Sequence, residues 1–348
     1  MRAALQTAGE VVEVDCPLRW LSRILQEGTA GQRTSPGGAA PDVRVAVEAT
    51  TAPFDTGGWE VLTRNAWRRP GQVVVRDACS SGLDLLVSTT GPTLDVVARW
   101  RPPVSGRAAS AVLRSRSALL LRAVLLQYPA LWWSGQRGRV PLHASVVTVA
   151  GSDRTVLIAG PGGVGKSTLV NAELARGGQA TCDNLCVSDG TTTWGLLEPR
   201  RVPAGADNAS TAVTGGRAGR RMPHGRREAA WTARSEALTP NLLLVLRRET
   251  ATAVTDAVAS PTTVTTCRPT DAARSLVAGT YMAGELRRYW AFAATLSLGT
   301  HLGPSHPAVE QVAEQLASRL RCVEVILGAG PRASLQTLLA SATEAAVR

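Results

Sequence analysis

Short apolar runs separated by turn residues dominate the first hundred positions of the chain. β-Branched and other apolar residues cluster or alternate at 11–14, 43–47, 72–75 and 83–87, between Gly, Pro and Asp residues. Such runs are typical of β-strands. The stretch 28–41 is rich in Gly, Ser, Thr and Pro and is predicted to be a loop. The first part of the chain is therefore predicted to be β-rich.

The pattern changes to a helical period between residues 107 and 131, where apolar positions recur on one face. Arg114, Arg116 and Arg122 occupy much of the other face, and Pro129 is predicted to end the helix. This connecting helix completes a predicted N-terminal domain over residues 1–135.

The remaining residues, 136–348, are predicted to form a second domain. Strand-like runs at 141–150 and 156–159 flank a Gly-Ser-Asp turn and predict a hairpin. Further apolar runs at 242–246 and 322–327 are predicted to be strands, and the C-terminal part is otherwise predicted to be mostly helical. The predicted fold class is α/β, in the α+β sense.

One stretch of this second domain carries a specific chemical signal. Gly160, Gly165, Lys166 and Ser167 fit G-x-x-x-x-G-K-[ST], the pattern of phosphate-binding loops. Glycines let backbone N–H groups wrap around phosphate oxygens, and the helix that follows directs its positive end at the anion. The residues expected to bind the nucleotide are Gly160, Gly162, Gly163, Val164, Gly165, Lys166, Ser167 and Thr168.

The lysine of this loop is the only lysine in the chain, although Lys and Arg together number 38. A compact ammonium suits a phosphate loop better than a planar guanidinium does. Lys166 is expected to reach the β- and γ-phosphates, and Ser167 to offer its hydroxyl to Mg²⁺.

Composition adds few constraints. The net charge of +11 is compatible with a nucleic acid, an acidic peptide or a phosphorylated substrate, and equally with a composition that is simply rich in arginine. Aromatic residues make up only 4% and do not interleave with basic ones, so base stacking is not favoured. The six cysteines contain no C-x-x-C pair, which argues against a zinc site and fits a reducing cytoplasm. No signal peptide and no apolar run long enough to span a bilayer is recognisable, so no membrane is expected.

Several nucleotide-binding classes are excluded. A guanine-specific Asn-Lys-x-Asp motif cannot exist beside a single lysine, and the Leu-Ser-Gly-Gly-Gln signature of ABC-type ATPases is absent. The apolar run 242–246 ends in Arg247 rather than in an acidic residue. Asp183 is therefore the first acidic residue after the loop that is expected to lie beside Mg²⁺.

This layout resembles one family. Leu142-His143-Ala-Ser, the hairpin, the glycine loop, Arg-Gly-Gly at 176–178 and Cys-Asp-Asn at 182–184 are similar to the HPr kinase/phosphorylase-related P-loop kinases. The resemblance covers about 142–187. The first 135 residues suit relatives in peptide-modification pathways, such as lasso-peptide precursor kinases. The resemblance implies a core like the nucleotide domain of phosphoenolpyruvate carboxykinase.

The resemblance also implies catalytic roles. Asp183 matches the general base that takes the proton from the acceptor hydroxyl, and His143 matches a histidine near the transferring phosphoryl group. Lys166 keeps its role at the phosphates.

The resemblance extends to the metal. The metal ligands expected from it are Ser167, Asn184 and, by position, Glu198. Asn184 departs from the second aspartate of the family, and its carbonyl carries less charge for a cation.

The sequence therefore predicts a kinase that uses ATP and Mg²⁺ to phosphorylate a Ser or Thr hydroxyl of a peptide or small protein. Two alternatives stay open: a small-molecule hydroxyl as acceptor, and a module that binds nucleotide or delivers a peptide without transfer chemistry. A homo-oligomer is also open. The arginine-rich stretch 199–230 is predicted to be an irregular, solvated loop, with contact to an acidic substrate or phosphate as the second reading.

Overall fold

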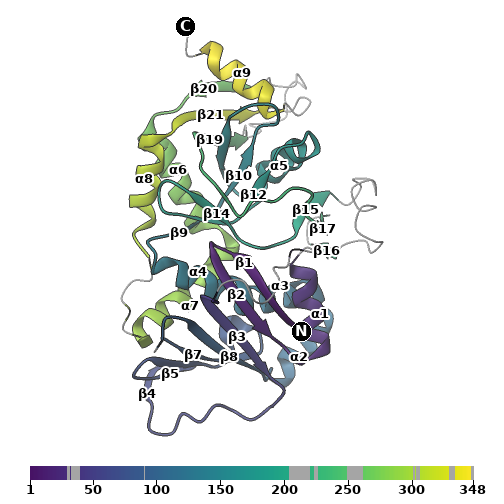
Figure 1. Ribbon diagram of the computed structural model, residues 1–348, viewed down its shortest axis with the longest axis vertical. Helices are drawn as coiled ribbons and strands as arrows, with labels where there is room; N and C mark the ends of the chain where they lie inside the picture. Colours follow the sequence, from purple (N-terminus) through teal and green to yellow (C-terminus); the bar gives the residue numbers. More distant parts are fainter. Residues whose placement is uncertain are drawn as a thin grey trace, which may run out of the picture. The chain divides into compact units, whose positions relative to one another are not determined.

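The computed structural model describes residues 1–29, 32, 40–89, 91–203, 220–222, 226–248, 262–300, 302, 306–328 and 334–345. Over these residues the chain is mixed α/β, with several sheets and separate helices, as the predicted α+β class requires (Figure 1).

Two compact units make up the chain, and each gathers separate stretches of sequence. The first unit comprises Met1–Gly138, Leu197–Trp231 and Arg287–Pro307. The second comprises Arg139–Leu196, Thr232–Leu286 and Ala308–Arg348. The division into domains at residues 135/136 stays a prediction.

The first unit is built on an eight-stranded sheet in the order β1-β2-β3-β8-β7-β6-β5-β4. β2, β3 and β8 are parallel to one another, and the other neighbours are antiparallel. The bounds are β1 (Arg2–Thr7), β2 (Glu10–Asp15), β3 (Val43–Glu48), β4 (Glu60–Thr63), β5 (Ala66–Arg69), β6 (Gln72–Val75), β7 (Leu83–Ser88) and β8 (Leu94–Trp100). Four of these strands contain the apolar runs of the sequence, so the predicted β-rich character is confirmed.

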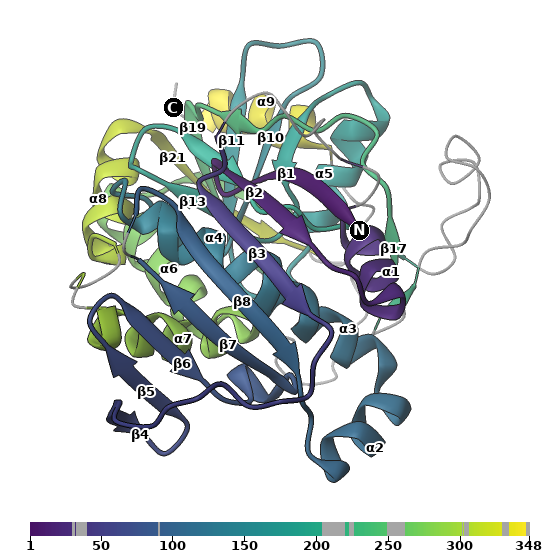
Figure 2. The same cartoon turned by 60° about the horizontal axis from the view of Figure 1, so that its bottom comes forward.

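Alternation explains how this sheet builds a core. In β3 the side chains of Val43, Val45 and Val47 are buried, whereas those of Arg44 and Ala46 are exposed. Residues two apart share one face of a strand. The covered face packs against α4 (Tyr128–Gly135), which contacts β2, β3 and β8 (Figure 2). Along the chain, α1 (Arg19–Gly28) follows β2 and precedes β3, and the 3-10 turn η1 (Ala78–Ser80) precedes β7.

The prediction of a single helix over 107–131 is wrong in detail. The segment forms α2 (Val104–Val112), α3 (Arg114–Arg122), a π-helical turn η2 (Ala123–Gln127) and α4. Pro129 does not end a helix, because it lies in the first turn of α4, where the missing N–H is tolerated. Arg122 is buried rather than exposed, because two carboxylates and a carbonyl surround its guanidinium.

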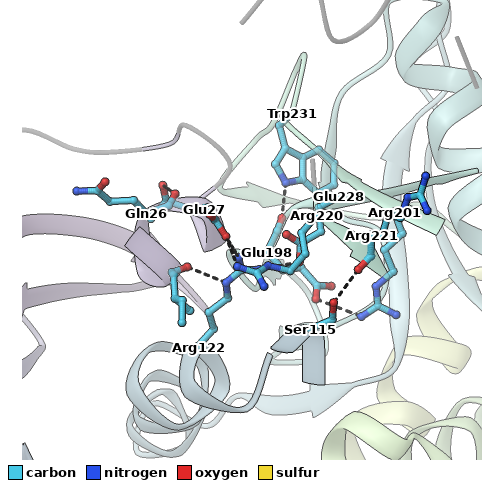
Figure 3. A network of polar contacts seen from close by, with 12 residues as sticks. Gln26, Glu27, Ser115, Arg122, Glu198, Arg201, Arg220, Arg221, Glu228 and Trp231 are labelled. Atoms are coloured by element: carbon cyan, nitrogen blue, oxygen red, sulfur yellow. Dashed lines mark hydrogen bonds and ion pairs between the residues drawn. The ribbon is translucent and has the colours of Figure 1, made fainter. Parts of the chain in front are cut away.

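The arginine-rich stretch 199–230 is not wholly irregular, which corrects the prediction. It contains a small sheet of β15 (Arg200–Pro203), β17 (Arg226–Ala229) and β16 (Arg221–Met222), and residues 204–219 and 223–225 lie outside the described residues. Glu228 of β17 is buried and pairs with Arg122 at 2.6 Å (Figure 3). Within β15, Arg201 pairs with the carboxylate of Glu198 at 3.4 Å, and Arg200 donates to the carbonyl oxygen of Ala230 at 2.8 Å.

The second unit contains a six-stranded sheet in the order β12-β10-β11-β19-β21-β20 (Figure 1). β10 and β11 pair antiparallel, which confirms the predicted hairpin, and β11, β19 and β21 are parallel. The bounds are β10 (Ala144–Thr148), β11 (Thr155–Ala159), β12 (Ala180–Cys182), β19 (Leu242–Arg248), β20 (Thr263–Thr266) and β21 (Arg321–Leu327). The carboxyl ends of β11, β19 and β21 therefore share one edge.

A four-stranded antiparallel sheet, β18-β14-β13-β9, completes the strands of this unit. Its strands are β9 (Val140–Leu142), β13 (Cys186–Ser188), β14 (Thr193–Gly195) and β18 (Ala237–Leu238). The helices are α5 (Lys166–Ala175), α6 (Pro269–Met282), α7 (Gly284–Thr300), which continues into the first unit, α8 (Val309–Arg319) and α9 (Leu335–Ala345). None of the helices in the described part of the chain has the length and apolar character needed to cross a membrane.

Candidate functional site

The glycine loop, residues 160–165, connects β11 to α5 and has a backbone that requires glycine at its start. Gly160 has φ +148°, and a Cβ atom there would lie 2.6 Å from the carbonyl oxygen of Leu246. Contacts that short do not occur for real Cβ atoms, so a side chain would displace the loop from β19. The predicted strand–loop–helix context is therefore confirmed.

Helix α5 presents its N-terminus beside the exposed part of the glycine loop. Pro161, Gly162 and Gly163 are exposed, and α5 begins at Lys166 with Gly165 as the preceding residue. The first N–H groups of a helix have no partner within it, and the helix dipole makes this end attractive to anions. An anion bound here would meet backbone donors and the half-buried hydroxyls of Ser167 and Thr168.

The side chain of Lys166 folds back over the glycine loop. Its Nζ atom donates to the carbonyl oxygens of Gly160 at 2.7 Å and Pro161 at 3.2 Å. The same atom lies 3.4 Å from Nε2 of His143. The ammonium is almost fully buried, with 5% of the residue exposed. A buried ammonium needs such acceptors, and a phosphate oxygen would be a stronger one.

His143 lies between β9 and β10, at the end of the hairpin next to the glycine loop. Its backbone N–H donates to Thr280 Oγ1 at 3.1 Å, and its ring nitrogen Nδ1 lies 3.2 Å from the carbonyl oxygen of Gly279. The second ring nitrogen, Nε2, lies 3.0 Å from Oδ1 of Asn184. Contacts on both ring nitrogens hold the imidazole in one orientation.

The charge on His143 follows from its surroundings. Burial, and next the positive charge of Lys166, lower the pKa of His143 from 6.5 to about 4, and the carboxylate of Glu285 opposes this shift. The imidazole is therefore neutral at pH 7 and leaves Lys166 as the cation of the pair.

The predicted acid and its neighbour form the connection between β12 and β13. The backbone carbonyl oxygen of Asp183 accepts hydrogen bonds from Ser145 Oγ at 2.6 Å and from Ser167 Oγ at 3.4 Å. Asp183 is fully buried, and Asn184 is 6% exposed. Hydroxyls from the hairpin and from α5 thus fix this connection beside the start of α5.

The structure brings most of the sequence-predicted residues together. His143, Lys166, Ser167, Asp183 and Asn184 form one connected cluster in the second unit.

Glu198 belongs instead to the first unit. Its carboxylate pairs with Arg201 at 3.4 Å, and its carbonyl oxygen accepts a hydrogen bond from Trp231 Nε1 at 2.6 Å (Figure 3). A metal-binding role for Glu198 stays a prediction.

Sequence reasoning missed three members of the cluster. Gly279 and Thr280 anchor His143, and Glu285 Oε1 accepts a hydrogen bond from Asn184 Nδ2 at 3.3 Å. They come from α6 and the start of α7, about a hundred residues after Asp183. The acidic residue in the first turn of a predicted helix was the only signal for Glu285, and nothing in the sequence indicated Gly279 or Thr280.

Several side chains of the cluster carry oxygen atoms of the types that Mg²⁺ prefers. These are the hydroxyl of Ser167, the amide of Asn184 and the carboxylates of Asp183 and Glu285, and Mg²⁺ is usually held by one or two carboxylates together with substrate phosphates and water. Among the described residues, no group of three or more His, Cys, Asp or Glu side chains is arranged to hold a metal ion by itself. This donor set therefore fits a metal that arrives with a nucleotide better than a resident one.

No protein-family model matches the chain, and no curated protein matches it in sequence. A function for this protein therefore depends on its own residues and their geometry.

Proposed function

We propose that the protein is an ATP- and Mg²⁺-dependent kinase that transfers the γ-phosphoryl group to a Ser or Thr hydroxyl of a peptide or small protein. One observation carries the proposal: the 3.4 Å approach of His143 Nε2 to Lys166 Nζ, within a cluster that also contains Asp183. The segments that contain His143, Lys166 and Asp183 meet beside the N-terminus of α5, and a helix N-terminus favours the binding of phosphate. In this proposal the second unit has a core like that of phosphoenolpyruvate carboxykinase.

The glycine loop and α5 bind the phosphates in this proposal. The loop surrounds them with N–H donors, and Lys166 exchanges its contacts with Gly160 and Pro161 for phosphate oxygens. Bound Mg²⁺ would neutralise negative charge on the phosphates, and Ser167 and Asn184 would help to hold it. Neutral His143 orients Lys166 without adding a competing positive charge.

Asp183 acts as the general base. It takes the proton from the acceptor hydroxyl while the acceptor oxygen forms a bond to the γ-phosphorus. The bond between the γ-phosphorus and its bridging oxygen breaks, and ADP leaves with that oxygen. Burial of the cluster keeps bulk water away from the reacting atoms, which favours transfer over hydrolysis.

The proposed setting is the cytoplasm, where ATP is abundant and the six cysteines, all free thiols, would stay reduced. The net charge of +11 favours an acceptor with acidic residues near the modified hydroxyl.

Intact-mass spectrometry tests the proposal directly. A candidate acceptor peptide is incubated with the protein, ATP and Mg²⁺, beside Asp183→Asn and the matched control Asp153→Asn, an exposed aspartate in the hairpin turn. We expect the peptide to gain one phosphoryl group with the wild type and with Asp153→Asn, and not with Asp183→Asn.

The other outcomes select among the alternatives. Full transfer by Asp183→Asn would contradict the role of Asp183 as base. Nucleotide binding without transfer to peptides, or to the small hydroxyl compounds of a fractionated extract, would favour a module that only binds nucleotide.

A further inference from the structure

The small sheet of the first unit, formed by β15, β17 and β16, has two faces that differ in charge. Consecutive residues of a strand lie on opposite faces, so Arg227 and Glu228 of the central strand β17 are separated. Residues directly opposite each other on neighbouring strands share a face, so Arg221 lies beside Arg227, and Arg201 lies beside Glu228. We name the face with Arg221 and Arg227 the arginine face, and the face with Arg201 and Glu228 the paired face.

Acidic side chains neutralise the arginines on the side of the paired face. Arg220 directly precedes β16 and belongs to this face by alternation, and its carbonyl oxygen accepts a hydrogen bond from the backbone N–H of Glu228. Three ion pairs form here: Arg122 with Glu228 at 2.6 Å, Arg201 with Glu198 at 3.4 Å, and Arg220 with Glu27 at 2.6 Å (Figure 3). Each of these three carboxylates therefore already has an arginine partner.

The arginine face has no such neutralisation. Arg221 and Arg227 are direct cross-strand partners, and within the described part of the chain no ion pair joins either of them to an acidic side chain. The Nε atom of Arg227 is fully covered and has no hydrogen-bond acceptor among the described residues. Like charges directly opposite each other destabilise a sheet, and a covered donor without an acceptor costs further free energy. An anion bound at this face would relieve both.

The stretches of sequence that interrupt the sheet do not supply this negative charge. Residues 204–219 contain one aspartate and one arginine, and residues 223–225 contain neither an acidic residue nor an arginine. Both stretches therefore have no formal net charge at pH 7 with histidine neutral. The positive charges of Arg221 and Arg227 are thus left for ions or for a ligand from solvent.

The arginine face fits the carboxylates of a peptide better than it fits a nucleic acid. Two guanidinium groups on neighbouring strands can each present a fork of N–H donors to a planar carboxylate. Arg221 is exposed and Arg227 is half-buried, so a ligand from solvent can reach both. The other positions of this face are Arg200, Val202 and Ala229, and none of them carries an aromatic ring on which a base would stack. The face therefore favours an acidic peptide segment.

We propose that the arginine face binds an acidic segment of the peptide that the kinase phosphorylates, and that Arg221 and Arg227 hold its carboxylates. The inference rests on the proposed function for the identity of the peptide, but the docking itself needs neither nucleotide nor Mg²⁺. Recognition of the acceptor then resides in the first unit, whereas the residues proposed for phosphoryl transfer reside in the second.

Fluorescence anisotropy at physiological ionic strength tests this docking surface without nucleotide. The whole chain is titrated into a fluorescein-labelled peptide of alternating glutamate and glycine, and into the same peptide with glutamine in place of each glutamate. The variants are Arg221→Gln, Arg227→Gln and the matched control Arg226→Gln. Arg226 is half-buried like its neighbour Arg227 but lies on the opposite face of β17. Lys166→Ala tests whether the peptide binds the glycine loop instead, and unlabelled oligothymidine serves as a competitor.

We expect the wild type to bind the glutamate peptide and not the glutamine peptide. Arg221→Gln and Arg227→Gln should each raise the dissociation constant about tenfold or more, the usual effect of losing hydrogen bonds between charged groups. Arg226→Gln should change it by less than about threefold, because salt screens charges that do not touch the ligand. Lys166→Ala should bind like the wild type. Without peptide, Arg221→Gln should unfold at the wild-type temperature or above it, because it removes a like-charge pair.

Equal losses of affinity in Arg226→Gln and Arg227→Gln would overturn the docking surface, because the sheet would then attract anions through its net charge alone. A lower unfolding temperature of Arg221→Gln together with lost binding would assign this arginine to the fold instead. Loss of binding in Lys166→Ala would place the peptide at the glycine loop, and displacement by oligothymidine at lower concentrations than by unlabelled glutamate peptide would favour a nucleic acid.

A parallel titration with an ATP analogue separates the two proposals. A wild type that binds the analogue but does not distinguish the two peptides would overturn the docking surface and leave the proposed kinase standing. A wild type that binds the glutamate peptide as expected but no ATP analogue would leave the docking surface standing and overturn the nucleotide site.

Discussion

The Nε2 atom of His143 lies 3.4 Å from the only lysine ammonium of the chain, that of Lys166. The two groups compete for positive charge, and Lys166 keeps it because an amine is intrinsically far more basic than an imidazole; burial and the charge of Lys166 then lower the pKa of His143. This relationship makes stability depend on pH.

We expect the free energy of unfolding to fall as the pH drops from about 6.5 to about 4. His143 has a pKa of 6.5 when unfolded and about 4 when folded, so the unfolded state binds more protons in this interval. The contribution is fully present above pH 6.5 and amounts to about 3 kcal/mol at most. Urea denaturation at several pH values in this range gives the free energy of unfolding of the wild type and of His143→Gln. The difference between their slopes against pH measures the contribution of His143. Equal slopes would show that His143 does not titrate as described.

The sole lysine gives a second prediction, about chemical labelling. An ATP analogue with an acyl phosphate transfers its acyl group to an amine near the phosphates, so we expect Lys166 to be the only labelled side chain. Excess ATP should suppress the label, and Lys166→Arg should abolish it. Peptide mapping by mass spectrometry locates the modification. Label confined to the N-terminal amine, or undiminished by ATP, would contradict nucleotide binding at this loop.

The glycine loop provides a matched pair of substitutions. Gly160→Ala would place a Cβ atom 2.6 Å from the carbonyl oxygen of Leu246, whereas a Cβ at Gly162 meets nothing within 4 Å. We expect Gly160→Ala to destabilise the protein by about 2–4 kcal/mol and Gly162→Ala to leave stability within about 0.5 kcal/mol of the wild type. Denaturant unfolding of both variants measures the contrast. Equal stabilities would show that the loop moves away from β19 at little cost.

The ion pair between Arg122 and Glu228 leads to a prediction about the stability of the first unit, because both side chains are buried and 2.6 Å apart. Arg122→Met leaves the carboxylate of Glu228 buried without this partner, and we expect a loss of about 3–5 kcal/mol. The double variant Arg122→Met/Glu228→Met should lose less than the single one, since no uncompensated charge remains.

Arg268→Ala is the control for this measurement. Arg268 also pairs with an aspartate, Asp271, but its side chain is 81% exposed, and we expect no measurable change in the unfolding curve. A double variant less stable than Arg122→Met would contradict the assignment of the loss to a buried charge.

Local elements of the fold were predictable where one period dominates the sequence. The strands β3 and β6, the hairpin of β10 and β11, and the helix after the glycine loop follow from alternation or from glycine placement. The break of the helix at 114–135 into a π-helical turn was not predictable, since Pro129 is compatible with both a helix end and a first turn.

The candidate site divides in the same way. His143, Lys166 and Asp183 lie within about forty residues, so their spacing carries information that a sequence pattern can convey. Glu285, Thr280 and Gly279 reach the cluster only through the packing of α6 and the start of α7, and no local pattern marks them. The burial of Arg122 was missed for the same reason, because its partner Glu228 lies far along the chain.

The antiparallel hairpin of β10 and β11 has a consequence for the order in which this site is assembled. Residues 143–184 contain the glycine loop, His143, Asp183 and Asn184, and they make their mutual contacts over short loops. Short loops close faster and at lower entropic cost than long ones. The groups that hold the imidazole and the amide, Thr280 and Glu285, emerge from the ribosome about a hundred residues later. During synthesis the contacts within 143–184 can therefore form before those that Thr280 and Glu285 add to them, whereas the glycine loop meets Leu246 only once β19 has been made.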